Sequence, residues 1–194
     1  MQRKECLRAV YPQLEQCLVV TIMGAVAVEL QGLGHRPNFF YLQHAMGLAS
    51  SLGLGLALGL PEQKVVVLDG DGSLLMNLGT LSTMARSAPR NLVHVVFDNR
   101  SYLSAGNSPT ATAAGADLEG IARASGIPRA VSARSVEEFR SAFLSARDAG
   151  QLTTLVAHVD TSGPSDWLTD LGLLENRFQF ARHCRSLTER SPRT

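Results

Sequence analysis

The sequence predicts an α/β fold in which a parallel sheet is covered by helices on both faces. Apolar runs rich in β-branched residues alternate along the chain with longer segments whose apolar residues recur at helical spacing. Two of these runs, residues 65–69 and 92–97, are almost wholly apolar, as expected of strands buried on both faces. At 194 residues, 45% of them apolar, the chain is long enough for one domain with a real core.

In the first third of the chain, the spacing of apolar residues predicts where helices and strands lie. Glycine or proline residues mark where they end. Helices are expected where apolar residues recur at helical spacing, at residues 3–15, 25–33 and 45–60. Strands are expected in the short runs between these helices, at residues 18–22 and 39–42. The glycines of the third helix should let it pack closely on the sheet; they are Gly47, Gly53, Gly55 and Gly59.

The middle of the chain predicts a strand, a turn, a helix, a second strand and a loop. The strand at 65–69 ends in Gly-Asp-Gly, and a helix is expected from Leu74 to about Arg86. The strand at 92–97 follows that helix. Residues 100–115 are rich in Ser, Gly, Asn, Thr and Ala, which indicates a loop rather than a core element.

Helix caps mark the elements that follow this loop. Asp117 is the expected N-cap of a helix over 117–125. Ser135 and Glu138 have the spacing of a capping box, which predicts a helix that runs to about Ala149. Short strands are expected on either side of this helix, at residues 130–131 and 153–159.

The C-terminal part of the chain is expected to form a tail beside the main domain. It shows one helical pattern, from Trp167 to about Leu187, and a polar end that we expect to be frayed. We therefore divide the chain into a domain at residues 1–160 and a helical tail at residues 161–194.

Composition argues against several classes of partner. The formal net charge of +1 gives no support for binding to nucleic acid or to an anionic membrane. The longest apolar stretch, residues 45–60, is shorter than a membrane span needs and ends at Pro61. The three cysteines, Cys6, Cys17 and Cys184, lack the spacing of a zinc site or a disulfide framework, so a reducing cytoplasm fits best.

The strongest candidate site lies where the two buried strands end. Asp71 follows one strand and Asn99 follows the other, and the ends of neighbouring parallel strands lie at the edge where open α/β sheets bind ligands. The glycines beside Asp71 allow a close approach of the backbone, and Ser73 stands at a helix start that favours phosphate. Carboxylate and amide oxygens suit Mg²⁺, which shares phosphate oxygens. These features predict a metal–diphosphate site.

Gly70-Asp71-Gly72, followed by 25 residues and then by Asp98-Asn99, resembles the thiamine-diphosphate signature of 2-oxo acid decarboxylases and their relatives. The family more often has Asn-Asn at the end, so Asp98 is a departure. Gly-Asp-Gly alone also fits an ordinary tight turn, but the spacing and flanking strands favour the family. The resemblance covers about residues 1–160. Within the family it is strongest to the β subunit of sulfopyruvate decarboxylases and the matching part of phosphonopyruvate decarboxylases, in three blocks: residues 46–53, 68–77 and 98–110.

The resemblance implies roles for the residues that match the motif. Asp71 and Asn99 would bind Mg²⁺ through side-chain oxygens and Ser101 through its backbone carbonyl. The turn at Gly70, with the N–H groups of Gly72 and Ser73, would hold the diphosphate.

Three residues near this motif keep alternatives open. Met46 would be the apolar residue that bends the cofactor, or else a core methionine. The backbone carbonyl of His44 would accept a hydrogen bond from the cofactor's amine, and its imidazole is either incidental or contacts substrate. Arg100 is either an anion-binding residue or a solvated loop arginine.

The resemblance also implies the activity. We expect the β subunit of a split thiamine-diphosphate-dependent decarboxylase, which releases CO₂ from a small 2-oxo acid, with sulfopyruvate favoured. A pyrimidine-binding α subunit would supply the activating glutamate, because these 194 residues show no domain for that role. Alternatives are a phosphonopyruvate decarboxylase, an acetolactate-synthase-like lyase, or a non-catalytic assembly subunit that binds the cofactor.

The helices are expected to carry more apolar surface than one face of the sheet can cover. Part of the helix at 45–60 and of the leucines after Gly72 (Leu74, Leu75, Leu78 and Leu81) should therefore form an interface, in a hetero-oligomer or a homodimer core.

Overall fold

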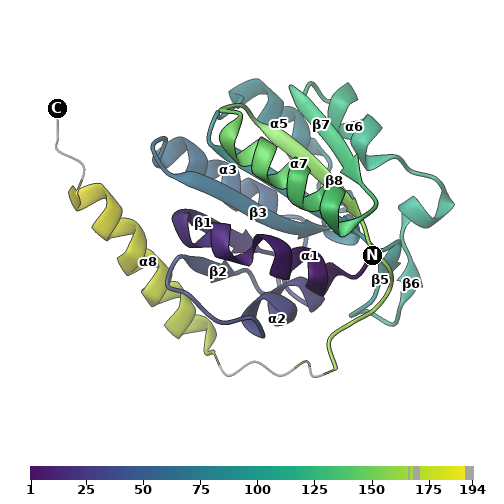
Figure 1. The fold of residues 1–194 in the computed structure, drawn as a ribbon, viewed down its shortest axis with the longest axis horizontal. Helices are drawn as coiled ribbons and strands as arrows, with labels where there is room; N and C mark the ends of the chain where they lie inside the picture. The colour runs from purple at the N-terminus through teal and green to yellow at the C-terminus, as the bar shows by residue number, and fades with distance from the viewer. Residues whose placement is uncertain (166, 168–170, 191–194) are drawn as a thin grey trace.

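The structure, a computed structural model, describes residues 1–165, 167 and 171–190 of the chain. A six-stranded sheet lies between two layers of helices (Figure 1). The strand order is β2-β1-β3-β4-β8-β7, and every pair of neighbours is parallel. The predicted fold class is confirmed.

The strands form where the apolar runs predict them, with ends that differ by at most two residues. They are β1 (Cys17–Thr21), β2 (Phe39–Tyr41), β3 (Lys64–Gly70), β4 (Leu92–Asp98), β7 (Arg129–Ala133) and β8 (Thr153–His158). Every residue of β1 and β4 is buried, and so are the five central residues of β3. These strands therefore form the centre of the core, as runs without polar alternation predict.

Helices α1 (Arg3–Val10), α2 (Ala25–Gln31) and α7 (Val136–Asp148) cover one face of the sheet (Figure 1). Helices α3 (Ala49–Gly59), α5 (Gly79–Ser87) and α6 (Leu118–Ala124) cover the other. The capping box of α7 is confirmed, since the Glu138 N–H donates to Ser135 Oγ at 3.1 Å and the Ser135 N–H donates to Glu138 Oε2 at 3.3 Å. Asp117 is the N-cap residue of α6, without a capping bond from its side chain. No helix in the described part of the chain is both long and apolar enough to cross a membrane.

Three predicted helices differ in extent. The first ends at Val10 and continues as a 3₁₀ helix (Tyr11–Gln16), because Pro12 lacks the N–H that an α-helix needs. The third begins at Ala49 rather than Ala45, since His44 and Gly47 have left-handed backbones with φ of 54° and 87°. The fourth divides into α4 (Asp71–Leu75) and α5, separated by a turn.

The predicted loop at 100–115 contains a short hairpin. Strands β5 (Ser101–Tyr102) and β6 (Ser108–Pro109) pair antiparallel, and a 3₁₀ turn (Ala111–Ala114) follows them. The hairpin brings the chain back to the end of β4.

Helix α8 (Leu173–Arg190) covers the edge strand β2 (Figure 1). The side chain of Asn176 takes the place of a neighbouring strand: its Oδ1 accepts from the Tyr41 N–H at 3.0 Å, and its Nδ2 donates to the Phe39 carbonyl at 2.8 Å. The sequence predicts that this helix begins at Trp167. In the structure α8 begins at Leu173, and the two residues before it, Leu171 and Gly172, are not helical. Residues 166 and 168–170, and the predicted polar end at 191–194, lie outside the described residues.

Gly53 is the glycine of α3 that allows close packing on the sheet. A Cβ atom at Gly53 would lie 2.1 Å from Val67 Cγ2 of β3, whereas Gly55 and Gly59 have nothing within 4 Å. The expectation of close packing therefore holds for Gly53 and is wrong for Gly55 and Gly59.

Gly53→Ala is expected to lower the free energy of unfolding by about 1–3 kcal/mol, because the added methyl group forces α3 away from Val67. The matched variant Gly55→Ala lies in the same helix and should be neutral or stabilising by up to about 1 kcal/mol, since it gains helix propensity without a clash. Urea unfolding of both variants measures the difference. Equal free energies would contradict this account of the packing.

Candidate functional site

The candidate site is a cleft at the carboxyl ends of β3 and β4. Asp71 begins α4 directly after β3, and Asn99 follows β4. Because the two strands are hydrogen-bonded neighbours, both residues reach the same edge of the sheet. The cleft has a volume of about 80 Å³, and its lining includes every predicted site residue except His44: Met46, Gly70, Asp71, Gly72, Ser73, Asn99 and Ser101.

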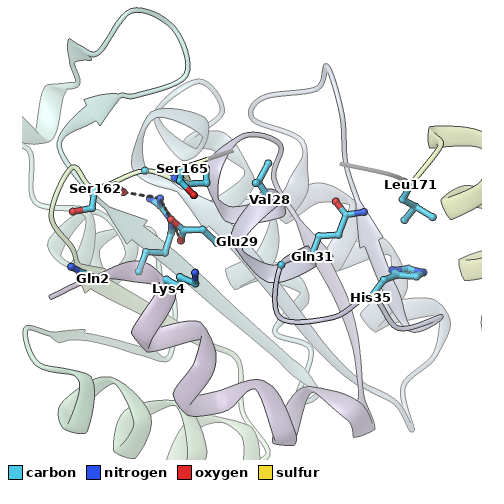
Figure 2. Close-up of a pocket in the computed structure, with 13 residues that line it drawn as sticks. Gln2, Lys4, Val28, Glu29, Gln31, His35, Ser162, Ser165 and Leu171 are labelled. Carbon is cyan, nitrogen blue, oxygen red and sulfur yellow. Dashed lines mark hydrogen bonds and ion pairs between the residues drawn. The ribbon is translucent and has the colours of Figure 1, made fainter. Parts of the chain in front are cut away.

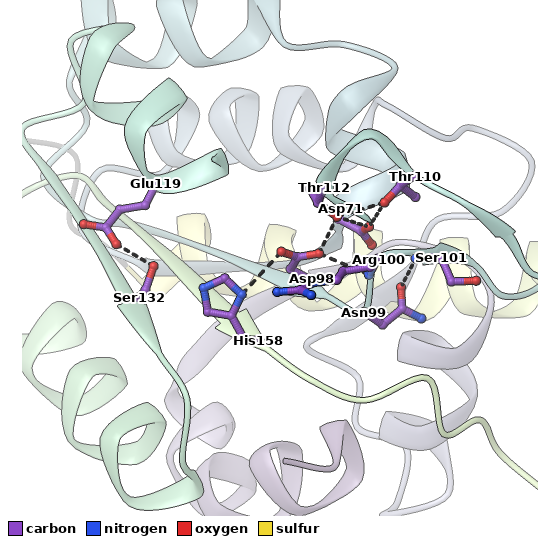
Figure 3. Close-up of polar contacts among 10 residues, drawn as sticks. All are labelled: Asp71, Asp98, Asn99, Arg100, Ser101, Thr110, Thr112, Glu119, Ser132 and His158. Atoms are coloured by element: carbon purple, nitrogen blue, oxygen red, sulfur yellow. Dashed lines mark hydrogen bonds and ion pairs between the residues drawn. The ribbon is translucent and has the colours of Figure 1, made fainter. Parts of the chain in front are cut away.

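The carboxylate of Asp71 is held by two threonines of the loop that follows β4 (Figure 3). The Thr110 hydroxyl donates to Asp71 Oδ2 at 2.6 Å, and Thr112 Oγ1 lies 3.2 Å from the same oxygen. Thr112 Oγ1 is also 2.7 Å from Asp98 Oδ1 and 2.9 Å from Thr110 Oγ1. Burial raises the pKa of the Asp71 carboxyl and the nearby Asp98 carboxylate adds to this, while the Thr110 hydrogen bond opposes it.

Asp98 and Asn99 turn the chain sharply at the end of β4. The Arg100 N–H donates to Asp98 Oδ1, and the Ser101 N–H donates to Asn99 Oδ1, each at 3.1 Å (Figure 3). Arg100 has a left-handed backbone with φ of 62°, and its side chain is exposed. It lines an open groove with Asp98 and His158 rather than the cleft. The turn thus places the backbone of Ser101 beside Asn99.

Met46 lies in the turn between β2 and α3, and this turn is fixed to α4. The Gly47 N–H donates to Ser73 Oγ at 3.0 Å, and Asn77 Nδ2 donates to the Gly47 carbonyl at 2.9 Å. Met46 is half-buried and lines the cleft, in contrast to Met84, which is 0% exposed in the core. Met46 therefore lies at the wall of the cleft, where the loss of its side chain can be tested against the loss of a fully buried methionine.

His44 and the two glycines of the motif differ in their surroundings. The side chain of His44 is exposed, outside the lining of the cleft. A Cβ atom at Gly72 would lie 2.5 Å from Tyr102 Cε1, whereas nothing lies within 4 Å of such an atom at Gly70. A side chain at position 72 would therefore displace the ring of Tyr102, which forms this wall of the cleft.

A larger hollow, of about 660 Å³, lies between α1, α2 and residues 162–165 (Figure 2). Its buried charges are paired with each other, since Arg3 Nε and a terminal guanidinium nitrogen reach the two carboxylate oxygens of Glu29 at 2.9 and 3.0 Å. Arg3 also donates to the Ser162 carbonyl at 3.1 Å. None of the predicted site residues lines this hollow, whereas all of them except His44 line the smaller cleft.

The polar groups of the cleft suit a hard divalent cation. Asp71 lines the cleft, and behind it four oxygen–oxygen contacts of 2.6 to 3.2 Å join its buried carboxylate and that of Asp98 to the hydroxyls of Thr110 and Thr112. Two hydroxyls carry only two protons, so the contacts outnumber the protons available to them. Carboxylate, amide and carbonyl oxygens are the ligands that Mg²⁺ takes in proteins, so the residues present fit this ion.

The fold and the cleft together define an α/β domain whose candidate ligand site lies at the carboxyl ends of parallel strands. Residues 23–157 match the family described as "Thiamine pyrophosphate enzyme, C-terminal TPP binding domain", and the chain belongs to this family.

Similar proteins agree with this assignment. The chain is 42% identical over 143 residues to sulfopyruvate decarboxylase subunit beta of Methanocaldococcus jannaschii, covering 74% of this chain and 75% of that subunit. It is 42% identical over 136 residues to phosphonopyruvate decarboxylase of Streptomyces hygroscopicus, covering 70% of this chain and 32% of that enzyme. Benzoylformate decarboxylase from Polynucleobacter necessarius has the same fold, with a TM-score of 0.69 at 18% identity over 84% of this chain and 34% of that one.

Proposed function

We propose that this chain is the β subunit of a thiamine-diphosphate-dependent 2-oxo acid decarboxylase that converts sulfopyruvate to sulfoacetaldehyde and CO₂. The observation that carries the proposal is the pair Asp71 and Asn99, side by side at two strand ends. The identity of 42% to a sulfopyruvate decarboxylase β subunit, over 143 residues, supports this choice of activity.

Different residues of the cleft would bind Mg²⁺ and the diphosphate of the cofactor. Asp71 and Asn99 would bind Mg²⁺ through their side chains and Ser101 through its carbonyl, while the turn at Gly70 and the N–H groups of Gly72 and Ser73 contact the diphosphate. Thiamine diphosphate, when bound, supplies the electron sink for the loss of CO₂.

The turn before α3 would orient the rest of the cofactor. Met46 would support its bent shape, and the carbonyl of His44 would accept a hydrogen bond from its amine. The bonds from Ser73 and Asn77 to Gly47 support this role, because they fix the turn that carries both residues.

A second subunit would complete the site. The cleft volume of about 80 Å³ is small compared with the ~300–1,000 Å³ of typical cofactor pockets, so most of the cofactor has to be enclosed by other walls. We propose that a pyrimidine-binding α subunit supplies those walls and the activating glutamate. Leu48, Leu58 and Met76 are 50%, 54% and 57% exposed and are candidates for the interface. Leu74 and Leu81, also expected in an interface, are instead core residues at 1% and 0% exposure.

The deciding assay supplies thiamine diphosphate, Mg²⁺ and sulfopyruvate to the chain alone, to the candidate α subunit alone, and to the two mixed. We expect CO₂ release only from the mixture, and its loss when a chelator removes Mg²⁺. Release by the homogeneous chain alone, at the rate of the mixture, would show that the site is not split.

Phosphonopyruvate is the alternative substrate, favoured by the 42% identity to a phosphonopyruvate decarboxylase. Both substrates present an anionic group beyond the keto acid, so competition between them in one assay ranks the two. We also propose that residues 1–160 form the cofactor-binding domain and 161–194 a helical tail packed on it through α8, in keeping with a family match that ends at residue 157.

A further inference from the structure

Thr110 and Thr112, the threonine pair, reach Asp71 because the hairpin after β4 returns the chain to its starting point. Strands β5 and β6 pair Ser101 with Pro109, and the Thr110 N–H donates to the Arg100 carbonyl at 3.1 Å. The next turn brings Thr112 to the same place (Figure 3). Two hydroxyls, two residues apart, thus face a carboxylate that lies 39 positions earlier than Thr110 in the chain.

The threonine pair acts on one atom of Asp71. Both hydroxyls lie within hydrogen-bond distance of Oδ2, at 2.6 and 3.2 Å, and neither is bonded to Oδ1. The two hydroxyls hold Oδ2 at the buried side of the carboxylate, and the Gly72 N–H also donates to the Asp71 carboxylate. Thr112 also reaches Asp98 Oδ1 at 2.7 Å, so the two carboxylates are tied together through one side chain.

Water cannot easily replace these hydroxyls. Asp71, Thr110 and Thr112 are 2%, 4% and 6% exposed, so the contact is closed to solvent. Loss of the Thr110 hydroxyl would remove the nearer donor from a buried carboxylate oxygen, which costs more than the loss of an exposed hydrogen bond.

We infer that Thr110 and Thr112 are positioning residues of the cation site: they occupy Asp71 Oδ2, so that Oδ1 is the oxygen presented to Mg²⁺. This inference rests on the proposed function, since it assigns a task within that site. Ser101, whose carbonyl would be the third ligand, pairs with Pro109 in the hairpin that leads to the threonine pair. Residues bonded to metal ligands commonly change metal affinity by about 10–100-fold when they are removed.

The test uses the full chain with its α subunit and compares Thr110→Val, Thr112→Val and Thr110→Ser with the unchanged chain. Thr154→Val is the matched control, because the Thr154 hydroxyl is buried in β8 with no hydrogen-bond partner in the described part of the chain. Calorimetry measures thiamine diphosphate binding as Mg²⁺ is varied, and thermal melts without Mg²⁺ measure folding. Turnover is measured at low and at saturating Mg²⁺.

Each valine variant of the threonine pair should raise the Mg²⁺ concentration for half-maximal cofactor binding by about 10–100-fold. Saturating Mg²⁺ should restore most of the turnover, Thr110→Ser should recover most of the affinity, and Thr154→Val should match the unchanged chain. A role in packing alone would instead lower the melting temperature and leave the Mg²⁺ dependence unmoved.

Three outcomes would overturn the inference. If the valine variants that fold bind Mg²⁺ and cofactor as the unchanged chain does, the hydroxyls do not position Asp71 and the proposed function stands. If Thr110→Ser loses as much affinity as Thr110→Val, the methyl group and not the hydroxyl is responsible. If the unchanged complex shows no Mg²⁺-dependent binding, the proposed function fails and this inference fails with it.

Discussion

Asp71→Asn should abolish Mg²⁺-dependent binding of thiamine diphosphate and at the same time stabilise the metal-free chain. The amide oxygen still accepts from the Thr110 hydroxyl, so the side chain keeps its place. It carries no charge, however, and so loses most of its attraction for a divalent cation. The same change removes a buried carboxylate that lies beside Asp98.

The pH dependence of this stabilisation has a definite sign. Burial raises the pKa of Asp71, so folding favours the protonated acid. The stability that folding gains from the raised pKa of Asp71 is fully present below pH 3.8, the ordinary pKa of an aspartate. It is lost as the pH rises through the raised pKa of the folded state. The advantage of asparagine over aspartate should therefore grow as pH rises. At neutral pH we expect Asp71→Asn to raise the free energy of unfolding of the metal-free chain by about 0.5–2 kcal/mol. Each kcal/mol should raise Tm by about 2–4 °C.

Calorimetry of cofactor binding by the complex and thermal melts of the metal-free chain across pH measure the two effects separately. Asp117→Asn is the matched control, because Asp117 is exposed and makes no capping bond with its side chain. It should change neither quantity. Normal cofactor affinity in Asp71→Asn would remove Asp71 from the metal site, and a lower Tm at neutral pH would contradict the argument from burial.

The sequence was sufficient to predict the fold and the placing of Asp71 beside Asn99. Strands such as β3 and β4 are buried on both faces, so their apolar runs stand out, and the prediction took the two as parallel neighbours, which they are. Once the two strands are neighbours, residues just past their ends have to lie at one edge. These predictions rest on local pattern and on one rule of topology.

The structure shows features of the cleft that the sequence alone did not. Apolar spacing continues through residues 45–48, but the left-handed backbones of His44 and Gly47 place Met46 in a turn before the helix. Left-handed geometry at a histidine has no signal in apolar periodicity. The threonine pair was missed for another reason: its approach to Asp71 depends on how a polar hairpin folds back, which is a tertiary property. The only sequence hint was that Thr110 lay in a motif shared with the family.

Met46→Ala should slow turnover by about a hundred-fold while leaving cofactor affinity and stability nearly unchanged. A poorly held reactant can cost this much when the misplacement is about 1 Å. In the proposed site the diphosphate and Mg²⁺ are held by other residues, so binding should survive the loss of the methionine. Met46 is half-buried at the wall of the cleft, so truncating it removes little core packing.

Met84→Ala provides the contrast that makes this result interpretable. Met84 is 0% exposed in α5, and its truncation should cost about 2–5 kcal/mol of stability with normal activity in the folded fraction. Thermal melts, calorimetry and turnover at saturating cofactor, measured on the same preparations, separate the two cases. If Met46→Ala instead behaves like Met84→Ala, losing stability and keeping its turnover, then Met46 is a packing residue.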